Sequence, residues 1–337
     1  MSDKRKVRWG VIGTTSRVAR ESAIPALMRS EHAELVAVAS RDAGHAAEVA
    51  AGVGPDCKAY ANYDALIADD RIDAIYIPLP NSLHVGWAVE AMNHGKNVLC
   101  EQPLTVTGAE AEEMRETAQD NGVLISESFS YWYHPLQREV AKAVQSGAIG
   151  AIKLVRVSVS FLQSEWNDYR RSRTLGGGAL LDCGAHGVHI ARQVWGSEPL
   201  AASASAVVDP NLGIDTTTTA LLEFAGGATT LLDSSFTLYS RSTYEIVGSE
   251  GAICVPKFLL GAEETCVWTL TRPDETWETH SVAATDTYEI EIDCFSRKLL
   301  GEDTPILPIE NSLANARVVD AIAQSARTGL RIKIGEA

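Results

Sequence analysis

The sequence predicts an α/β protein with two domains: an N-terminal doubly wound parallel sheet and a C-terminal α+β domain with a large, open, mostly antiparallel sheet. Its 337 residues amount to roughly two domains of about 150 residues each. Up to about residue 130, short continuous apolar runs alternate with helical segments, as expected for parallel strands buried on both faces. Beyond that point, polar and apolar residues alternate and glycines mark the turns. We therefore place the domains at residues 1–130 and 131–337.

In the first domain, strands and helices are expected to alternate along the chain. Residues 7–12 form an apolar run that is too short for a helix and ends at Gly13, so they predict a buried strand. Asp42 is suited to cap the helix after the second strand, and Gly95 to end a later helix. Further strands are expected at residues 35–39, 74–77, 97–100 and 124–129, and helices at 16–29, 42–51, 64–68, 84–94 and from Thr107 onward.

In the second domain, most segments have the composition of β-strands. Residues 152–161 alternate between polar and apolar side chains, which predicts a strand with one buried face. Glycine-containing turns such as 225–227 separate the segments that follow. The other strands are expected at residues 216–224, 229–236, 244–247, 252–255 and 265–271, and helices at 134–146, 179–195, 289–300 and 312–328.

Charge and cysteine content narrow the classes of partner and compartment. The chain has 29 Lys and Arg against 44 Asp and Glu, a net charge of −15, which repels nucleic-acid backbones and anionic lipid surfaces. No run approaches the roughly 18 apolar residues of a membrane span, and the N-terminus does not resemble a signal peptide. The six cysteines include no C-x-x-C pair, so we expect reduced cysteines in a cytoplasmic protein.

The turn after the first strand is a candidate phosphate-binding loop. The segment that starts at Gly10 and contains Gly13 spans the end of a strand and the start of a helix, where backbone N–H groups and the helix N-terminus can stabilise a pyrophosphate. The G-x-G-x-x-G pattern is incomplete because Thr15 or Ser16 occupies the place of the second glycine. The alternative is a plain turn between strand and helix. The expected cofactor-binding residues here are Gly13, Thr14, Thr15, Ser16, Arg17 and Val18.

The end of the second strand bears on the choice between NAD(H) and NADP(H). In a doubly wound domain an acid at this turn bonds the ribose 2′-hydroxyl, whereas an arginine accommodates a 2′-phosphate. Ser40 and Arg41 therefore favour NADP(H), with NAD(H) possible because Asp42 follows them. The alternative is an exposed arginine on a loop.

Two proline-containing turns follow later strands of the same sheet. In parallel sheets the ligand lies outside the carboxyl ends of the strands, so both turns are expected to line its binding crevice. The alternative is that both turns are purely structural. The expected cofactor contacts in them are Pro78, Leu79, Asn81, His84, Glu101 and Gln102.

The segment from Gly176 to His189 is a candidate acid–base site. On a helix, Asp182, His186 and His189 share one face, since they are spaced four and three residues apart. A carboxylate beside an imidazole fixes its tautomer and raises its basicity. The glycines at 176–178 would let a substrate or cofactor approach the backbone. Two alternatives stay open: a polar helix face, and a zinc site, although no second cluster of ligands stands out and no metal is expected.

Taken together and in this order, these segments resemble the GFO/IDH/MocA family of NAD(P)-dependent oxidoreductases. The resemblance covers nearly the whole chain, and the branch with an Asn-Asp-x-Arg segment, which includes xylose and dihydrodiol dehydrogenases and sugar ketoreductases, is the most similar. It depends on the order of the segments more than on any single one. The matching segments are residues 9–13, 78–84, 101–103, 131–135, 167–170 and 176–186.

The resemblance implies an N-terminal Rossmann domain, hydride transfer at a carbon of a sugar, sugar derivative or cyclic polyol, and a homodimer or homotetramer. It implies an NAD(P) cofactor, which Ser40 and Arg41 narrow to NADP with NAD possible, His186 oriented by Asp182 as the acid–base residue, and Gln102 as a hydrogen-bond donor to the reacting oxygen. For the substrate it implies Tyr133, His134 and Arg170 beside His186. The arginines at 170, 171 and 173 form a local basic cluster that would suit an acidic or phosphorylated substrate, or is simply a solvated loop.

One residue departs from the family in a way that affects the expected chemistry. The family's turn reads Glu-Lys-Pro, whereas this chain has Gln102 in place of the lysine. Glutamine donates a hydrogen bond but carries neither a charge nor a transferable proton, a loss on the order of a few kcal/mol of transition-state stabilisation. This leaves two hypotheses, an oxidoreductase that relies on His186 and a cofactor-binding sensor or regulatory protein that has lost catalysis.

Overall fold

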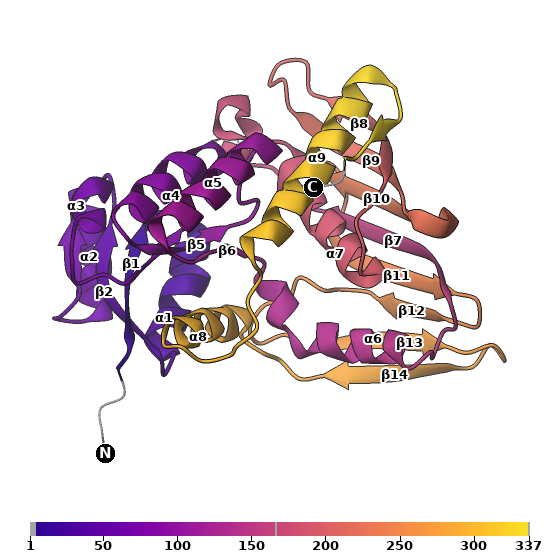
Figure 1. The fold of residues 1–337 in the computed structure, drawn as a ribbon, viewed down its shortest axis with the longest axis horizontal. Coiled ribbons are helices and arrows are strands. Elements are labelled where there is room, and N and C mark those ends of the chain that lie inside the picture. Colours follow the sequence, from indigo (N-terminus) through magenta and orange to yellow (C-terminus); the bar gives the residue numbers. More distant parts are fainter. Residues whose placement is uncertain (1–4, 166, 336–337) are drawn as a thin grey trace. The chain divides into compact units, whose positions relative to one another are not determined.

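The computed structural model describes residues 5–165 and 167–335, which form two compact units. The first unit contains the chain up to Thr105, Ala109–Ser130 and Asp286–Leu313. The second contains Val106–Gly108, Tyr131–Thr285 and the chain from Ala314 onward. Each unit is built on one sheet (Figure 1). Residues 286–313, which the sequence analysis assigned to the second domain, pack with the first unit.

The sheet of the first unit is parallel and confirms the predicted fold class. Its strand order is β3-β2-β1-β4-β5-β6. The order reverses between β1 and β4, and in doubly wound sheets ligands bind outside the carboxyl ends of the strands at such a point. The strands are β1 (Val7–Ile12), β2 (Ala33–Ala39), β3 (Lys58–Tyr60), β4 (Ala74–Ile77), β5 (Asn97–Glu101) and β6 (Ile125–Ser128).

Helices cover both faces of this sheet because successive strand residues point to opposite sides. On one face Ile75 packs in a core that includes Met92 of α4, and on the other Tyr76 packs in a core that includes Leu27 of α1 and Phe295 of α8. The helical elements are η1 (Ala19–Ala23, a π-helical turn), α1 (Ile24–Arg29), α2 (Ala43–Val53), α3 (Tyr63–Ile67), η2 (Asn81–Leu83), α4 (His84–Asn93), α5 (Gly108–Asn121) and α8 (Thr287–Leu299). The short η3 (Ser130–Tyr133) begins at the last residue of the segment Ala109–Ser130, and its other residues belong to the second unit.

Helix α8 joins this unit from a distant part of the sequence. The buried indole N–H of Trp9 in β1 donates to the Ser296 hydroxyl at 3.0 Å. The rings of Trp9 and Phe295 lie 5.4 Å apart between centroids. His32, just before β2, contacts the Asp293 carboxylate at 2.7 Å. These contacts fix α8 against the strands at the centre of the sheet.

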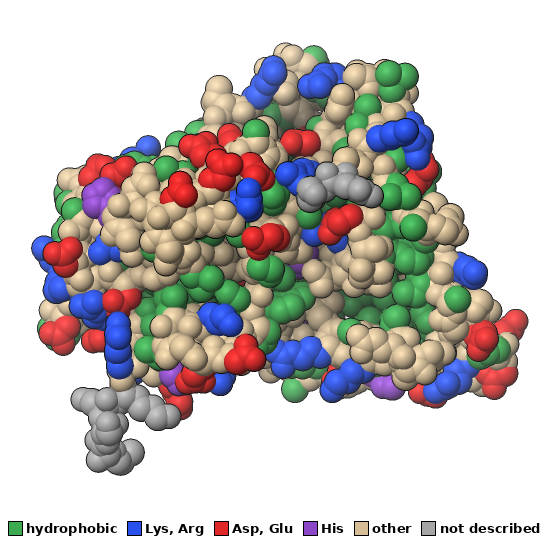
Figure 2. Space-filling model, in the orientation of Figure 1, with side chains coloured by type: hydrophobic (Ala, Val, Ile, Leu, Met, Phe, Trp, Pro, Cys, Tyr) green, Lys and Arg blue, Asp and Glu red, His purple; other side chains and the backbone are tan. Residues whose placement is uncertain are grey.

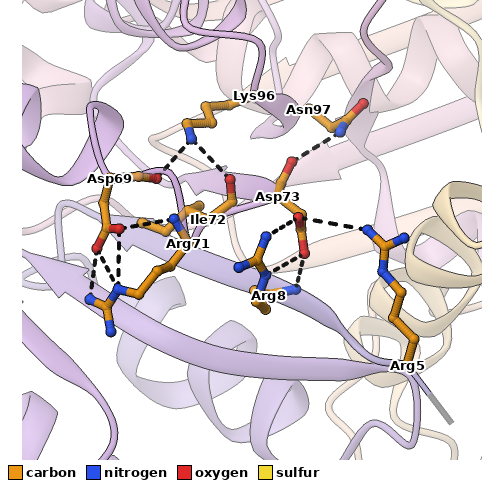
Figure 3. Close-up of polar contacts among 8 residues, drawn as sticks. All are labelled: Arg5, Arg8, Asp69, Arg71, Ile72, Asp73, Lys96 and Asn97. Carbon is orange, nitrogen blue, oxygen red and sulfur yellow. Dashed lines mark hydrogen bonds and ion pairs between the residues drawn. The ribbon is translucent and has the colours of Figure 1, made fainter.

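A polar network holds the amino ends of the central strands (Figure 3). The Asp73 carboxylate accepts hydrogen bonds from the Arg8 main-chain N–H at 2.9 Å and from its side-chain Nε and Nη2 at 3.0 and 2.7 Å. The Asp73 carbonyl accepts from the Asn97 amide at 2.9 Å. Lys96 donates to two main-chain carbonyls, one of them that of Asp69 at 2.8 Å. The network fixes β1, β4 and β5 relative to one another at the edge opposite their functional turns.

The second unit contains a mixed sheet in which, among the strands that the structure describes, β7 and β10 pair in parallel and the others antiparallel. Its strand order is β14-β13-β12-β11-β7-β10-β9-β8-β15. Three of these strands, β8, β14 and β15, were not predicted. The strands are β7 (Ile152–Ser160), β8 (Ala201–Val208), β9 (Asp215–Glu223), β10 (Thr229–Ser235), β11 (Arg241–Gly248), β12 (Ala252–Val255), β13 (Cys266–Thr271), β14 (Trp277–Val282) and β15 (Ile332–Lys333).

Helices lie against one face of this sheet (Figure 1). Val188 of α7 and Val318 of α9 share a core with Leu232 of β10. A Cβ at Gly187 would collide with Leu232, so glycine is required where α7 meets the strands. The helical elements of the unit include α6 (Pro135–Gln145), η4 (Tyr169–Arg171), η5 (Arg173–Leu175), η6 (Leu180–Gly184, a π-helical turn), α7 (Ala185–Trp195), η7 (Ala225–Gly227) and α9 (Ile309–Thr328).

Acidic side chains dominate part of the surface. Figure 2 shows Asp and Glu side chains gathered over α5 of the first unit, where Glu113, Glu116 and Asp120 are exposed. Among the described residues, no helix combines the length and the apolar character needed to cross a membrane.

Candidate active site

The turn after β1 is shaped by close packing against the turn after β4. Gly13 has a φ of +74°, and a Cβ at this position would collide with Leu79. The Gly13 N–H donates to the Ala39 carbonyl at 3.0 Å, which ties the turn to β2. Thr14 is fully buried, and its hydroxyl has no hydrogen-bond partner. Of the other predicted residues, Thr15 and Arg17 are exposed and Ser16 and Val18 are partly buried.

The predicted 2′-phosphate residues lie at the carboxyl end of β2. Ser40 is buried, and its hydroxyl accepts the Asp42 N–H at 3.2 Å. Arg41 is exposed, and its guanidinium lies beside the Tyr63 hydroxyl, where it partly offsets the rise in the pKa of Tyr63 caused by burial. Asp42 caps α2 by accepting the N–H groups of Gly44 and His45, so its predicted role as a helix cap is confirmed.

The turns after β4 and β5 are linked by a buried histidine. His84 places its two ring nitrogens 2.7 Å from the Leu79 carbonyl and 3.0 Å from the Pro103 carbonyl. The ring is fully buried, and burial lowers its pKa. His84 was predicted as a cofactor contact, whereas here it fixes the two turns that carry the other candidates. The Gln102–Pro103 peptide bond in the second turn is cis.

Two tyrosines that sequence reasoning missed hold the Glu101 carboxylate. The Tyr76 hydroxyl donates to Glu101 from the neighbouring strand. The Tyr288 hydroxyl donates to it from α8, and burial raises the pKa of both tyrosines well above the usual value. The Gln102 N–H lies 3.3 Å from the other Glu101 oxygen. Sequence reasoning missed them because Tyr76 lies in a different strand and Tyr288 far along the chain. No local sequence pattern connects either residue to the turn after β5.

The first unit has features that fit a bound dinucleotide. At the carboxyl end of β1, the Thr14 hydroxyl is buried without a partner, and at the end of β5 the same is true of the Gln102 side-chain oxygen. Buried polar atoms are nearly always hydrogen-bonded in the complete protein, so such groups indicate places for a ligand or water. Thr14 lies at the reversal of the strand order and Gln102 at the carboxyl end of a neighbouring strand, the edge at which doubly wound sheets bind nucleotides.

In the second unit, Asp182 and His186 lie at a π-helical turn that continues into α7. The His186 Nδ1 lies 3.1 Å from the main-chain carbonyl of Asp182. Since a carbonyl only accepts, Nδ1 carries the hydrogen and Nε2 is the basic nitrogen. Burial lowers the pKa of His186 to about 4. The ring is therefore neutral at pH 7 and can accept a proton, but its orientation comes from a carbonyl instead of the expected carboxylate.

The Asp182 carboxylate binds an arginine. Arg170 Nε donates to Asp182 Oδ1 at 2.8 Å, and Arg170 Nη1 lies 3.4 Å from Asp168. The glycines at 176–178 allow this arrangement, because the Gly178 N–H donates to the Arg170 carbonyl at 3.1 Å and a Cβ at Gly177 would collide with that carbonyl. The glycines thus allow the Arg170 main chain to pack closely against them, whereas the sequence analysis expected a substrate or cofactor at this place.

The remaining candidates are buried in the second unit. His189 is fully buried, and its Nδ1 lies 2.6 Å from the Tyr131 hydroxyl. His134 caps α6 through Nδ1, which accepts the Leu136 N–H at 3.1 Å. Tyr133 is also buried. Within the described part of the chain, no three His, Cys, Asp or Glu side chains are grouped so as to hold a metal ion.

Comparison with known proteins identifies the family. Residues 7–129 match the model of the GFO_IDH_MocA oxidoreductase family with an NAD-binding Rossmann fold, and residues 137–254 match the GFO/IDH/MocA C-terminal domain. The chain belongs to the GFO/IDH/MocA family. The predicted resemblance is confirmed, and with it the assignment as an oxidoreductase.

Several relatives of this GFO/IDH/MocA protein act on sugars. It is 36% identical to D-xylose 1-dehydrogenase (NADP(+)) 2 of Haloferax volcanii, over 97% of this chain and 99% of the relative. It is 32% identical to dTDP-3,4-didehydro-2,6-dideoxy-alpha-D-glucose 3-reductase of Saccharopolyspora spinosa, over 97% and 99%. The crystal structure of a 3-ketoreductase from Actinomadura kijaniata with NADP and TDP-benzene superimposes with a TM-score of 0.90 at 31% identity, covering 95% and 98%.

The glycine requirement at 177 gives a first prediction for this oxidoreductase. Gly177→Ala is expected to displace the Arg170 loop and lower the free energy of unfolding by about 1–3 kcal/mol, because the new Cβ meets backbone that cannot easily move. Urea denaturation followed by circular dichroism measures the change. Gly86→Ala in α4 is the control, since nothing lies within 4 Å of its Cβ, and it should be neutral or stabilising. Equal stability of Gly177→Ala and the wild type would contradict the prediction.

Proposed function

We propose that this protein is an NADP(H)-dependent oxidoreductase that transfers hydride at a CH–OH or C=O carbon of a sugar, sugar derivative or cyclic polyol. The observation that carries the proposal is the neutral His186 ring, whose Nδ1 bonds a main-chain carbonyl and whose Nε2 is therefore basic. Relatives named as an NADP-dependent xylose dehydrogenase and as sugar 3-reductases support the reaction class.

In the direction of oxidation, His186 would remove the proton of the substrate hydroxyl through Nε2. A nicotinamide cofactor held by the first unit would supply the acceptor for the hydride of the same carbon. The imidazolium formed at His186 keeps its Nδ1–H on the Asp182 carbonyl, so the ring does not rotate during the transfer. In the direction of reduction the same nitrogen returns the proton. Gln102 would donate a hydrogen bond to the reacting oxygen without adding charge.

The first unit would hold the cofactor. The turn at Gly13 and Thr14 would face the pyrophosphate, with the buried Thr14 hydroxyl as a donor that has no partner among the described residues. Arg41 would contact the 2′-phosphate, because it is exposed beside Ser40 and Asp42 is already committed to the cap of α2. The predicted cytoplasmic location and the predicted homodimer or homotetramer stay predictions.

The role of His186 can be tested through its effect on rate and pH dependence. His186→Ala is expected to lower kcat for sugar oxidation by about 10²–10⁴-fold, since a positioned base is lost, while NADPH binding by fluorescence stays unchanged. In the wild type, the rate should fall as the pH drops through about 4, where the ring becomes protonated. His94→Ala, at the exposed residue that caps the C-terminus of α4, is the control. A His186→Ala enzyme with wild-type kcat on every sugar and cyclitol tested would refute the assignment.

The cofactor preference can be tested by binding alone. Arg41→Ala is expected to raise the Kd for NADPH about tenfold or more and to leave the Kd for NADH unchanged, because a charge-assisted hydrogen bond to the 2′-phosphate is lost. Titration of NADPH, NADH and 2′,5′-ADP by calorimetry or fluorescence measures both. Arg20→Ala, an exposed arginine of η1, is the charge-matched control. A parallel loss for NADPH and NADH would place Arg41 outside the 2′-phosphate contact.

Gln102 favours one alternative, a cofactor-binding sensor or regulatory protein with the same fold. Gln102→Lys restores the family's cation beside the reacting oxygen, and in an oxidoreductase it is expected to raise kcat by about tenfold or more. Turnover with NADP(+) over a panel of sugars and cyclitols measures this. Tight NADPH binding with no turnover in either form, and identical behaviour of His186→Ala, would instead support the sensor.

A further inference from the structure

We propose that Arg170 is a positioning residue: it holds the Asp182 carboxylate away from the His186 imidazole, so that the ring is oriented by a carbonyl and remains a neutral base. This inference rests on the proposed acid–base role of His186. It differs from the resemblance, which places Arg170 in the substrate pocket. The name Arg170 clamp is used below for Asp168, Arg170 and Asp182.

The first argument is the geometry of the ion pair. Arg170 Nε donates to Asp182 Oδ1 at 2.8 Å, within the range of charge-assisted hydrogen bonds. The Asp182 side chain is only 7% exposed and that of Arg170 29%. A buried carboxylate without a partner would be costly, and Arg170 supplies the opposite charge. Asp182 therefore has its partner already, and His186 bonds the Asp182 main chain at 3.1 Å.

The second argument is that the loop is built to hold Arg170 in place. Asp168 accepts the Arg170 main-chain N–H at 2.8 Å, and its other oxygen lies 3.4 Å from Nη1. On the opposite side of the residue, the Gly178 N–H donates to the Arg170 carbonyl at 3.1 Å. Gly177 packs so closely on that carbonyl that a Cβ there would collide. Hydrogen bonds thus fix both the main-chain N–H and the carbonyl of Arg170, independently of the contact between its side chain and Asp182.

Aromatic rings restrict the guanidinium further. Its carbon lies 4.7 Å from the centre of the Tyr169 ring and 5.9 Å from that of Phe161. Guanidinium groups are favoured at such distances from ring faces. Contacts with two carboxylates and two rings leave the Arg170 side chain little freedom to move toward a ligand. Its positive charge already faces the negative charges of Asp168 and Asp182. This suits a fixed support for Asp182 better than an anchor for an anionic substrate.

The clamp has an electrostatic consequence for the base. The groups of this unit that face His186 are Asp182, Arg170, Tyr131 and His189. Burial is the main cause of the low His186 pKa; the Asp182 charge raises it and the Arg170 charge lowers it. Burial also keeps the pKa of His189 well below normal, so that ring adds no charge. Removal of the Arg170 charge would therefore raise the His186 pKa and let the freed Asp182 carboxylate approach the ring.

The experiment compares two variants. Arg170→Gln removes both the positive charge and the planar guanidinium group, whereas Arg170→Lys keeps the charge and removes the guanidinium group. The readout on the free protein is the titration of the His186 ring by NMR of ¹⁵N-histidine-labelled samples, assigned with His186→Asn. Arg170→Gln is expected to raise the His186 pKa by about one unit or more, and Arg170→Lys by less. The acid limb of kcat/KM for sugar oxidation should move to higher pH by the same amount, with kcat reduced in both variants.

Arg241→Gln is the matched control. Arg241 pairs with Asp233 at 2.5 Å, so it too is an arginine bound to a carboxylate. Asp233 follows Leu232 in β10, and Leu232 packs in the core that includes α7, so the control pair lies on the other face of the sheet. The substitution removes one charge and should leave the His186 titration unchanged.

The outcomes separate this inference from the proposed function. A raised KM for the sugar with an unmoved His186 titration would overturn the inference in favour of a substrate contact. Reduced stability and activity with an unmoved titration would reduce Arg170 to a purely structural residue. If Arg170→Gln shifts the NMR titration although no sugar is turned over by the wild type, the clamp stands and the proposed function fails.

Discussion

The parallel pairing of β1 with β2 on one side and β4 on the other is the constraint on which the candidate cofactor-binding turns of the first unit depend. Because the strands run in one direction, the turns at Gly13, Ser40 and Pro78 emerge at the same edge of the sheet. The network of Arg8 and Asp73 at the opposite edge fixes the registers, so the turns cannot shift independently. The contact between Gly13 and Leu79 then brings two of these turns together closely enough to exclude a side chain at residue 13.

The turn after β5 is supported from far along the chain. Helix α8 docks on β1 through Trp9 and Ser296, and this brings Tyr288 to Glu101. The hydroxyls of Tyr76 and Tyr288 both donate to the Glu101 carboxylate, Tyr76 to one oxygen, and the Gln102 N–H lies near the other oxygen. These donors are neutral, and the residue at position 102 is uncharged too. A change in α8 can therefore affect the turn that carries Gln102 without touching any ligand.

Much of the fold could be predicted from local pattern, since most strands of the parallel sheet are apolar runs between turn signals. Strand β8 was missed because its Ala- and Ser-rich sequence has low β-propensity and its pairing with β9 decides the conformation. Strand β14 was missed because most of its residues are exposed and so carry no alternating pattern. The return of residues 286–313 to the first unit depends on contacts such as Trp9 to Ser296, which no local pattern reveals.

For the candidate site, too, local sequence patterns predicted the contacts within one helix but not those made by a distant loop. Spacing on a helix predicted that Asp182 and His186 lie together, and they do, but the π-helical turn at Leu180–Gly184 puts a carbonyl and not the carboxylate against the ring. The carboxylate's partner, Arg170, comes from a loop whose position depends on Gly177 and Gly178. Helical spacing alone does not show that Arg170 and His186 compete for the Asp182 carboxylate. For this reason the sequence analysis placed Arg170 in the substrate pocket.

The two histidines of this helix differ in chemistry although they share one face. His189 has Nδ1 at 2.6 Å from the Tyr131 hydroxyl and Nε2 at 3.3 Å from the Gln193 amide, and no part of the ring is exposed. Both of its nitrogens are engaged inside the protein, so it cannot exchange a proton with a substrate without breaking this pair. His186 bonds a carbonyl with Nδ1 and is only partly buried. Under the proposed function, Nε2 of His186 would meet the substrate hydroxyl, and the difference between the partners of the two rings, not their spacing, favours His186 over His189 for this role.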